Sequence, residues 1–300
     1  MPTDETDVLF DAIVVGGSYA GLSAAMQLAR ARQRVLVIDA GQRRNRFAPA
    51  AHGLIGQDGR PPGAIADARA QVLAYPNVRW LHGSATRASG RSEDFVVDVD
   101  DGRRCRARRL VLATGVEDAL PPIDGLQERW GRSVFHCPYC HGYELDRGRV
   151  GVIAVGELSM HQALMLPDWG TTTFLLDGAF EPDDDQRAAL ARRGVAVEPA
   201  RIARVEGVAT VVFEDGRRRD FDGLFVATRT RVNGPLAEQL GCELEQGPLG
   251  AFIRTDTLKA TSVPGVFACG DAARGAHSIA FAIGDGVQAG SSAHRSLMFG

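Results

Sequence analysis

The sequence predicts an α/β fold built from two similar three-layer domains, the second inserted into the first. Three observations predict it. A short apolar strand, a glycine-rich turn, a helix and a second apolar strand occur twice in the chain. In both copies the second strand ends in an aspartate at the same spacing, 23 positions from Gly16 to Asp39 and 23 from Ala154 to Asp177. A later apolar strand, Val266 to Cys269, returns the chain to the first domain.

Composition and charge narrow the class of protein. The chain has 300 residues, 45% of them hydrophobic and 24% charged, which is ordinary for a globular protein. A formal net charge of −3 gives no reason to expect nucleic acid or an anionic membrane as a partner. Met1 to Asp7 is acidic and polar, so we expect no signal peptide, and no apolar run is long enough to predict a membrane span. Five cysteines, an odd number, do not fit a secreted disulfide scaffold, so we expect a cytoplasmic protein.

The first domain is expected to open with a parallel strand, a helix and a second strand. β-Branched apolar residues form the strands, and Gly16-Gly17 ends the first of them. A segment rich in Arg, Gly and Pro then predicts a surface loop, and Asp101-Gly102 predicts a turn between antiparallel strands. The expected elements are strand 12–15, helix 19–31, strand 35–38, loop 43–63 and strands 95–100 and 104–112.

The second domain is expected to repeat that order after a boundary at Pro121-Pro122. We expect residues 1–117 and 246–300 to form the first domain and residues 118–245 to form the second. Both are then Rossmann-like (three-layer ββα) dinucleotide-binding domains. The expected elements of the second domain are strand 149–155, helix 159–166 and strands 173–176, 211–213 and 224–227. A closing helix, 278–296, is expected in the second part of the first domain.

The first glycine-rich turn has the pattern of a dinucleotide site. It reads Gly16-Gly17-Ser18-Tyr19-Ala20-Gly21, follows a strand and opens a helix, whose N-terminus offers N–H groups to a pyrophosphate. Asp39 is placed to accept a hydrogen bond from a ribose hydroxyl. Ser18 replaces the middle glycine of the usual motif, and a purely structural turn is the alternative. Ala113-Thr114-Gly115 and Gly270-Asp271, each after an apolar strand, favour the dinucleotide site.

The stretch His136-Cys137-Pro138-Tyr139-Cys140-His141 carries the redox chemistry that the sequence predicts. Two intervening residues let Cys137 and Cys140 close a disulfide, and Pro138 predicts a helix start directly after Cys137. A helix N-terminus and a neighbouring imidazolium lower the pKa of a thiol, and His136 and His141 could move protons in thiol–disulfide exchange. A metal site and an inert buried pair are the alternatives. No second C-x-x-C completes a zinc site, so we expect no metal, and we expect the remaining thiols to be inert: Cys105, Cys242 and Cys269.

Together these motifs resemble the low-molecular-weight thioredoxin reductase family of FAD-dependent pyridine nucleotide-disulfide oxidoreductases over nearly the whole chain. The resemblance implies FAD in the discontinuous domain, a homodimer, and a disulfide that exchanges electrons with the flavin. By family order it implies that Cys140 faces the flavin and that Cys137 exchanges with the substrate. His141 stands where thioredoxin reductases carry an aspartate acid. His277-Ser278-Ile279 stands where they carry Arg-Gln-Ala, at the start of the last helix and near flavin N1.

The NADPH site of that family is not preserved in this sequence. The second turn, Ala154-Val155-Gly156-Glu157-Leu158-Ser159, lacks the first glycine and adds a negative charge at Glu157. The stretch after Asp177 is acidic and has no arginine for a 2′-phosphate. The use of NAD(P)H is therefore doubtful. The Cys-Pro-Tyr-Cys-His-Gly-Tyr-Glu stretch resembles instead the dithiol oxidases of the gliotoxin and holomycin type.

The leading hypothesis is a FAD-dependent enzyme that oxidises a small dithiol through Cys137 and Cys140, with molecular oxygen as acceptor. His141, with His136, is the expected base. One alternative is an NAD(P)H-dependent disulfide reductase acting on a small disulfide or a small redox protein, with NADH favoured over NADPH by Asp177. Another is a flavin redox sensor that does not turn over a substrate. The sequence after Ser296 shows no output or DNA-binding motif, which argues against the sensor.

Overall fold

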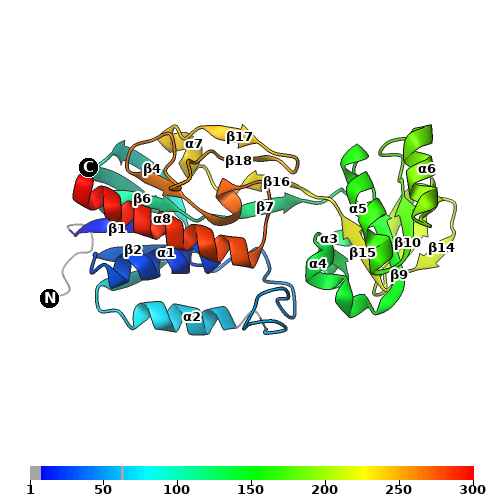
Figure 1. Ribbon diagram of the computed structural model, residues 1–300, viewed down its shortest axis with the longest axis horizontal. Coiled ribbons are helices and arrows are strands. Elements are labelled where there is room, and N and C mark those ends of the chain that lie inside the picture. Colours follow the sequence, from blue (N-terminus) through cyan, green and yellow to red (C-terminus); the bar gives the residue numbers. More distant parts are fainter. Residues whose placement is uncertain (1–7, 62–63) are drawn as a thin grey trace. The chain divides into compact units, whose positions relative to one another are not determined.

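The computed structural model describes residues 8–61 and 64–300, which divide into two compact units (Figure 1). Unit 1 contains the residues up to 44 together with 63–117 and 230–300, and unit 2 contains 45–62 and 118–229. The chain passes between the units in β7 (Val116–Ala119) and β16 (Arg229–Val232), which pair as a two-stranded sheet. The acidic segment Met1 to Asp7, on which the signal-peptide expectation depended, lies outside the described residues.

Unit 1 is built on a seven-stranded sheet in the order β3-β2-β1-β6-β5-β4, with β19 also paired to β6. The neighbours β3, β2, β1, β6 and β19 run parallel, whereas β5 and β4 are antiparallel. Because strand side chains alternate between faces, the sheet supports two cores. The strands are β1 (Leu9–Val15), β2 (Val35–Asp39), β3 (Val78–His82), β4 (Ala85–Arg91), β5 (Asp94–Val99), β6 (Arg104–Leu112) and β19 (Val266–Ala268).

One face of this sheet packs against α1 (Tyr19–Arg30) and α8 (Ile279–Phe299), which lie side by side in Figure 1. The other face packs against α7 (Leu236–Leu240) and the hairpin of β17 (Leu244–Gln246) and β18 (Ala251–Ile253). Small residues bring α8 unusually close to α1. A Cβ on Gly286 would overlap the carbonyl oxygen of Ala20, and one on Gly290 would overlap that of Ala24. The start of α8 is therefore held beside the start of α1.

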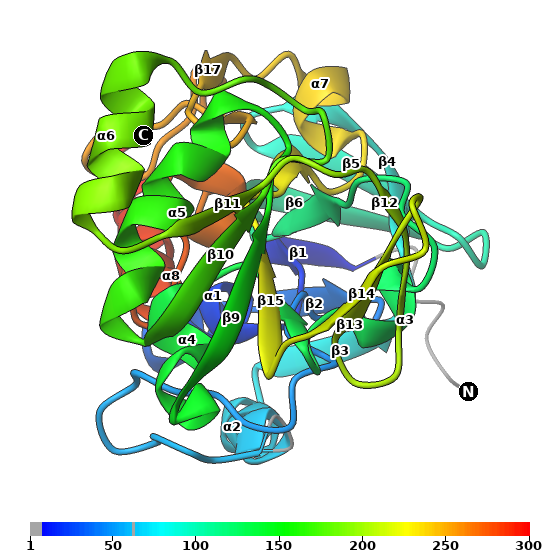
Figure 2. The same ribbon diagram turned by 90° about the vertical axis from the view of Figure 1, so that its right-hand side faces the viewer.

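Unit 2 repeats this architecture on an all-parallel sheet, in the order β11-β10-β9-β15-β8. Figure 2 shows α5 and α6 on one side of the sheet and the antiparallel strands β12, β13 and β14 on the other. The elements are β8 (Val134–Phe135), β9 (Arg147–Ile153), α5 (Met160–Met165), β10 (Gly170–Leu175), α6 (Asp184–Arg192), β11 (Ala196–Glu198), β12 (Ile202–Glu206), β13 (Thr210–Phe213), β14 (Arg218–Asp220) and β15 (Gly223–Val226).

The predicted fold class is confirmed, and several expected boundaries differ. Residues 45–62, expected in the first domain, belong to unit 2. The second unit ends at 229 rather than 245, because α7 and the β17–β18 hairpin pack on the unit 1 core. The expected helix 159–166 is α5 flanked by two 3₁₀ turns, η3 (Glu157–Ser159) and η4 (Leu166–Asp168), since Pro167 cannot continue a helix. A helix not expected from the sequence, α2, covers Ala64–Leu73. Among the described helices, none is both long and apolar enough for a membrane crossing.

Candidate functional site

The glycine turn of unit 1 is shaped so that only glycine fits at three of its positions. Gly16 has a φ of +106°, and a Cβ there would overlap the carbonyl oxygen of Ala113. A Cβ on Gly21 would overlap the carbonyl oxygen of Gly16, and one on Gly17 would overlap the ring of Trp80. The turn therefore packs backbone against backbone at the carboxyl ends of β1 and β6, where ligands bind in parallel α/β sheets.

Asp39, at the end of β2, is tied into this turn. Its Oδ1 accepts a hydrogen bond from the Gly17 N–H at 3.0 Å. Trp80 closes the same corner, and Arg69 stacks on its ring with 4.3 Å between the guanidinium carbon and the ring centroid. Asp39, the predicted hydrogen-bond acceptor for the ribose, thus also positions the turn.

The polar groups around the turn fit a dinucleotide such as FAD. Ser18 precedes α1 in an extended conformation and makes no side-chain cap, so the helix N-terminus is left to an external acceptor. Thr114 Oγ1 is buried and has no hydrogen-bond partner in the described part of the chain, as expected of a group that meets a ligand. Gly115 has a φ of +69°, and its carbonyl accepts from Asn233 N at 3.0 Å.

The segment from Gly270 to Ile279, which the sequence also predicts to belong to the dinucleotide site, lies beside the turn. A Cβ on Gly270 would lie 2.8 Å from the Cβ of Ala20, so the segment lies directly against the start of α1. Ser278 caps α8 by accepting from Phe281 N at 3.1 Å, and Ile279 is the first residue of the helix.

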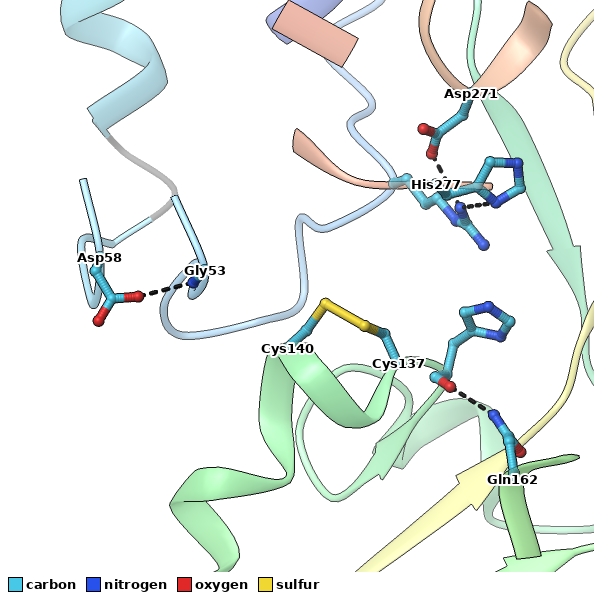
Figure 3. Close-up of a disulfide and its surroundings, with 9 residues drawn as sticks. Gly53, Asp58, Cys137, Cys140, Gln162, Asp271 and His277 are labelled. Carbon is cyan, nitrogen blue, oxygen red and sulfur yellow. Dashed lines mark hydrogen bonds and ion pairs between the residues drawn. A yellow bond between two sulfur atoms is a disulfide. The ribbon is translucent and has the colours of Figure 1, made fainter. Parts of the chain in front are cut away.

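Arg44 holds this segment through hydrogen bonds to Asp271 and His277, a role for which the sequence gives no motif (Figure 3). Its Nη1 donates to Asp271 Oδ2 at 2.9 Å and to His277 Nδ1 at 2.8 Å. Because a guanidinium can only donate, Nδ1 of His277 accepts, and Nε2 carries the hydrogen that points to the Arg274 carbonyl at 3.2 Å. The only sequence signal for Arg44 was its place in the arginine-rich loop.

We expect Asp39→Ala to weaken FAD binding by ~1–3 kcal/mol, because the substitution removes both the ribose acceptor and the Gly17 contact. Fluorescence titration of apoprotein with FAD measures the effect. Asp11→Ala, at a carboxylate near the opposite end of the sheet that pairs with Arg34, is the control and should bind FAD like the wild type. Equal affinity of the Asp39→Ala variant and the wild type would remove Asp39 from the site.

Cys137 and Cys140 form a disulfide, with 5.3 Å between their Cα atoms (Figure 3). The predicted helix start is confirmed: Cys137 precedes α4 (Pro138–His141), and Cys140 N donates to Cys137 O at 3.2 Å. Gly142 lets α4 sit against Trp169, whose ring meets Tyr139 edge-on at 5.3 Å.

The three other cysteines are buried and form no disulfide. Burial raises the pKa of Cys242, and it raises the pKa of Cys269 to about 12, so these thiols stay protonated. In residues 8–61 and 64–300, no three His, Cys, Asp or Glu side chains gather in a way that could hold a metal ion.

The two histidines beside the disulfide have different environments. His136 Nδ1 lies 3.3 Å from the hydroxyl of Thr228, which in turn donates to Asp118 Oδ1 at 2.7 Å. Gln162 Nε2 donates to the His136 carbonyl at 2.6 Å (Figure 3). His136 is thus held in a hydrogen-bonded chain that ends on a carboxylate.

His141 is held by stacking instead of hydrogen bonds. Its ring lies parallel to that of Phe135, with centroids 4.4 Å apart, and neither ring nitrogen has a partner among the described residues. Burial lowers the pKa of His141, against a smaller raising effect of Glu144. At neutral pH the imidazole is therefore uncharged and can accept a proton.

Two acidic side chains of the predicted nucleotide site in unit 2, Glu157 and Asp177, make internal hydrogen bonds. Gln186 Nε2 donates to Glu157 Oε1 at 2.8 Å, which fixes the acidic side chain. Asp177 Oδ1 accepts from Ile202 N at 2.7 Å, and burial raises the pKa of that carboxyl. Arg201, remote in sequence, brings a cation to this stretch, and its Nη1 donates to the Asp177 carbonyl at 2.9 Å.

Comparison with known proteins agrees with this geometry. Residues 10–286 match the family described as pyridine nucleotide-disulphide oxidoreductase. The chain is 34% identical to thioredoxin reductase sirT of Leptosphaeria maculans, over 94% of this chain and 93% of that protein. A crystal structure of an oxidoreductase from Agrobacterium tumefaciens superposes with a TM-score of 0.95 at 56% identity, over 97% of this chain and 99% of the other.

The crystal structure of HlmI superposes with a TM-score of 0.89 at 33% identity, over 97% of this chain and 93% of the other. The family match and the redox-type cysteine pair lead to one assignment. The chain belongs to the pyridine nucleotide-disulphide oxidoreductase family and is a thioredoxin reductase-like enzyme that acts on thiols and disulfides.

Proposed function

We propose that this enzyme is a FAD-dependent dithiol oxidase that converts a small dithiol to a disulfide, with molecular oxygen as acceptor. The observation that carries the proposal is the disulfide of Cys137 and Cys140 beside His141, an imidazole whose ring nitrogens are buried and whose lowered pKa keeps it uncharged. The resemblance of the cysteine motif to dithiol oxidases and the similarity to HlmI support it.

The cysteine pair and His141 would perform the exchange in two steps. In the first, a substrate thiol gives its proton to His141, its sulfur bonds to Cys137 Sγ, and the Cys137–Cys140 bond breaks with Cys140 leaving as a thiolate. In the second, the other substrate thiol gives its proton to the Cys140 thiolate, and its sulfur displaces Cys137 from the mixed disulfide as a thiolate. The substrate has then lost two electrons and two protons, and both cysteines are reduced.

The FAD site in unit 1 would complete the turnover. Bound FAD would supply the acceptor for the two electrons of the cysteine pair and the redox group at which oxygen, with two protons, becomes hydrogen peroxide. The Gly16–Gly21 turn and the first turn of α1 would hold the pyrophosphate, and Asp39 a ribose hydroxyl. Arg44 orders the Asp271–His277 segment, and Ser278 fixes the start of α8, whose N-terminus stabilises negative charge.

The contacts in the unit 2 turn argue against NADPH as the usual electron donor. Glu157 keeps a negative charge where a pyrophosphate needs positive potential, and Asp177 is bonded to the backbone of Ile202. Arg201 is the observation that favours the alternative, an NAD(P)H-dependent disulfide reductase, because it supplies the cation missing from the neighbouring sequence.

Oxygen consumption with dithiothreitol tests the proposal. In air, the FAD-loaded enzyme should release one hydrogen peroxide for each dithiothreitol oxidised. The Cys137→Ser, Cys140→Ser double variant should release none above background. Hydrogen peroxide release that does not depend on dithiothreitol would contradict a dithiol oxidase, and so would a wild type that releases no peroxide.

We expect a cytoplasmic homodimer. Four apolar side chains of α8 are exposed in the single chain, which suits a surface that a second copy covers: Phe281 at 48%, Val287 at 39%, Met298 at 56% and Phe299 at 76%. Light scattering at micromolar concentrations should give twice the mass of 32.1 kDa. A Phe281→Glu variant should shift toward monomer, whereas a wild type that is monomeric throughout would rule out this expectation.

A further inference from the structure

Asp285 is a buried carboxylate on α8 that two cations share. The residue is only 8% exposed. Its Oδ1 lies 2.9 Å from Lys259 Nζ, and its Oδ2 lies 3.2 Å from Arg274 Nη1. Lys259 is the only lysine of the chain. Neither cation belongs to α8, so the shared carboxylate ties two other segments of unit 1 to this helix.

The two cations bracket the strand and the turn that lead into the predicted FAD site. Lys259 comes before β19, and its carbonyl accepts a hydrogen bond from Ala268 N, on that strand, at 3.0 Å. Arg274 comes directly after the 3₁₀ turn η5 (Gly270–Ala273), which follows β19. Asp285 therefore fastens both ends of the stretch formed by β19 and η5 to α8.

Arg274 makes further contacts on both sides of its own segment. Its guanidinium stacks on Phe281 of α8, with 4.1 Å between the guanidinium carbon and the ring centroid, and its carbonyl lies 3.2 Å from His277 Nε2. The Nε of Arg274 is buried and has no hydrogen-bond partner in the described part of the chain. Because Arg44 holds the same segment at His277, the segment is clamped between Arg44 and Asp285.

We propose that Asp285 is a positioning residue for FAD, which acts through Lys259 and Arg274 to hold the segment Gly270–Ile279 in the shape that binds the cofactor. The proposal rests on the FAD site of unit 1 and holds for any electron donor. Without the carboxylate, two partly buried cations lose the charge that they share, and Arg274 is released toward water. FAD must then order the segment as it binds, which lowers its affinity.

Fluorescence titration of the apoprotein with FAD tests this role. Asp285→Asn should raise the Kd for FAD about tenfold, the effect of losing one charge-assisted contact, and Asp285→Glu should recover part of the affinity. Ser296→Ala is the matched control, because it removes a 2.7 Å hydrogen bond from Arg109 Nε near the other end of α8. That variant should bind FAD like the wild type. An unchanged Kd in Asp285→Asn would overturn the proposal.

Thermal unfolding with and without FAD separates positioning from a role in folding alone. FAD raises the unfolding midpoint because it binds only the folded chain. Asp285→Asn should reduce this rise, whereas Ser296→Ala should lower the midpoints with and without FAD by the same amount. A normal FAD-induced rise in Asp285→Asn would show that the network supports folding only. Arg274→Met, at a side chain that is 26% exposed, is the second variant if Asp285→Asn does not fold, and it should show the same reduced rise.

The single lysine gives a probe in the wild type itself. Lys259 is 17% exposed and paired with Asp285, so its amine should react slowly with acetic anhydride, as followed by peptide mass spectrometry. FAD should slow this acetylation several-fold further, because binding and the network stabilise each other reciprocally. Equal rates with and without FAD would overturn the coupling. A wild type without a FAD-induced rise in midpoint would overturn the FAD site and this proposal with it, whereas failed dithiol oxidation would leave both standing.

Discussion

Cys137→Ser and Cys140→Ser are each expected to abolish dithiol oxidation, a loss larger than any other single substitution should cause. The disulfide is the group that the substrate attacks, and a serine hydroxyl cannot form it. The variants should keep their fold and bound FAD, because both cysteines lie outside the Gly16–Gly21 turn. Peroxide release and FAD absorbance measure the two properties on the same sample. Cys242→Ser, at a buried free thiol, is the matched control and should stay active.

The two variants should also separate the roles of the cysteines. If Cys137 receives the substrate and Cys140 resolves, Cys140→Ser should accumulate a mixed disulfide between Cys137 and the dithiol, detectable by mass spectrometry under mild conditions. The Cys137→Ser variant should accumulate little of this mixed disulfide. Trapping only in Cys137→Ser would reverse the assignment, and residual peroxide release above a few per cent in both variants would show a route that bypasses the pair.

His141→Ala is expected to slow dithiol oxidation by roughly 10²–10⁴, the usual contribution of a general base. Because alanine also removes the stack on Phe135, His141→Phe is the sharper variant: it keeps an aromatic ring against Phe135 but has no proton acceptor. Both variants should be slow. Near wild-type activity in His141→Phe would mean that the ring packs α4 and does not move a proton. His161→Ala is the control.

The pH dependence of the wild type follows from the same residue. Since burial lowers the pKa of His141, the unprotonated base is present at lower pH than an ordinary histidine would allow. The rate of the dithiol step should therefore rise with pH through a midpoint below 6.5, the ordinary pKa of a histidine, and then level off. In His141→Phe this acid limb should disappear.

The sequence predicted those features that local patterns determine. Two β-α-β units with matching spacing, Gly16 in a positive-φ turn and Pro138 at the start of a short helix each depend on a few consecutive residues, and the structure has them. The cysteine pair was predicted from its spacing, and its disulfide is present. The positions of Thr114 and Asp39 were predicted from strand ends, because Thr114 follows the end of β6 and Asp39 is the last residue of β2.

What the sequence could not predict depends on contacts between distant segments. The loop from Asn45 to Pro61 reads as a featureless connection in unit 1, yet it packs in unit 2 and pairs His52 with Glu144. Arg201 reaches Asp177 from the next crossover, and Arg44 reaches Asp271 over more than 200 positions. Each of these is a charged side chain whose partner is set by tertiary folding, for which no periodicity or motif gives a signal.

Anaerobic reduction of the enzyme-bound FAD, compared among dithiothreitol, NADH and NADPH, tests the central claim most directly. The negative charge of Glu157 in the turn and the internal hydrogen bond of Asp177 predict weak nucleotide binding, with two defects of ~1–3 kcal/mol each lowering affinity by about ten- to ten-thousandfold. The account predicts that dithiothreitol bleaches the flavin rapidly, that both nucleotides do so slowly, and that hydrogen peroxide appears when air is admitted. Rapid bleaching by micromolar NADPH would contradict it and assign the enzyme as a disulfide reductase.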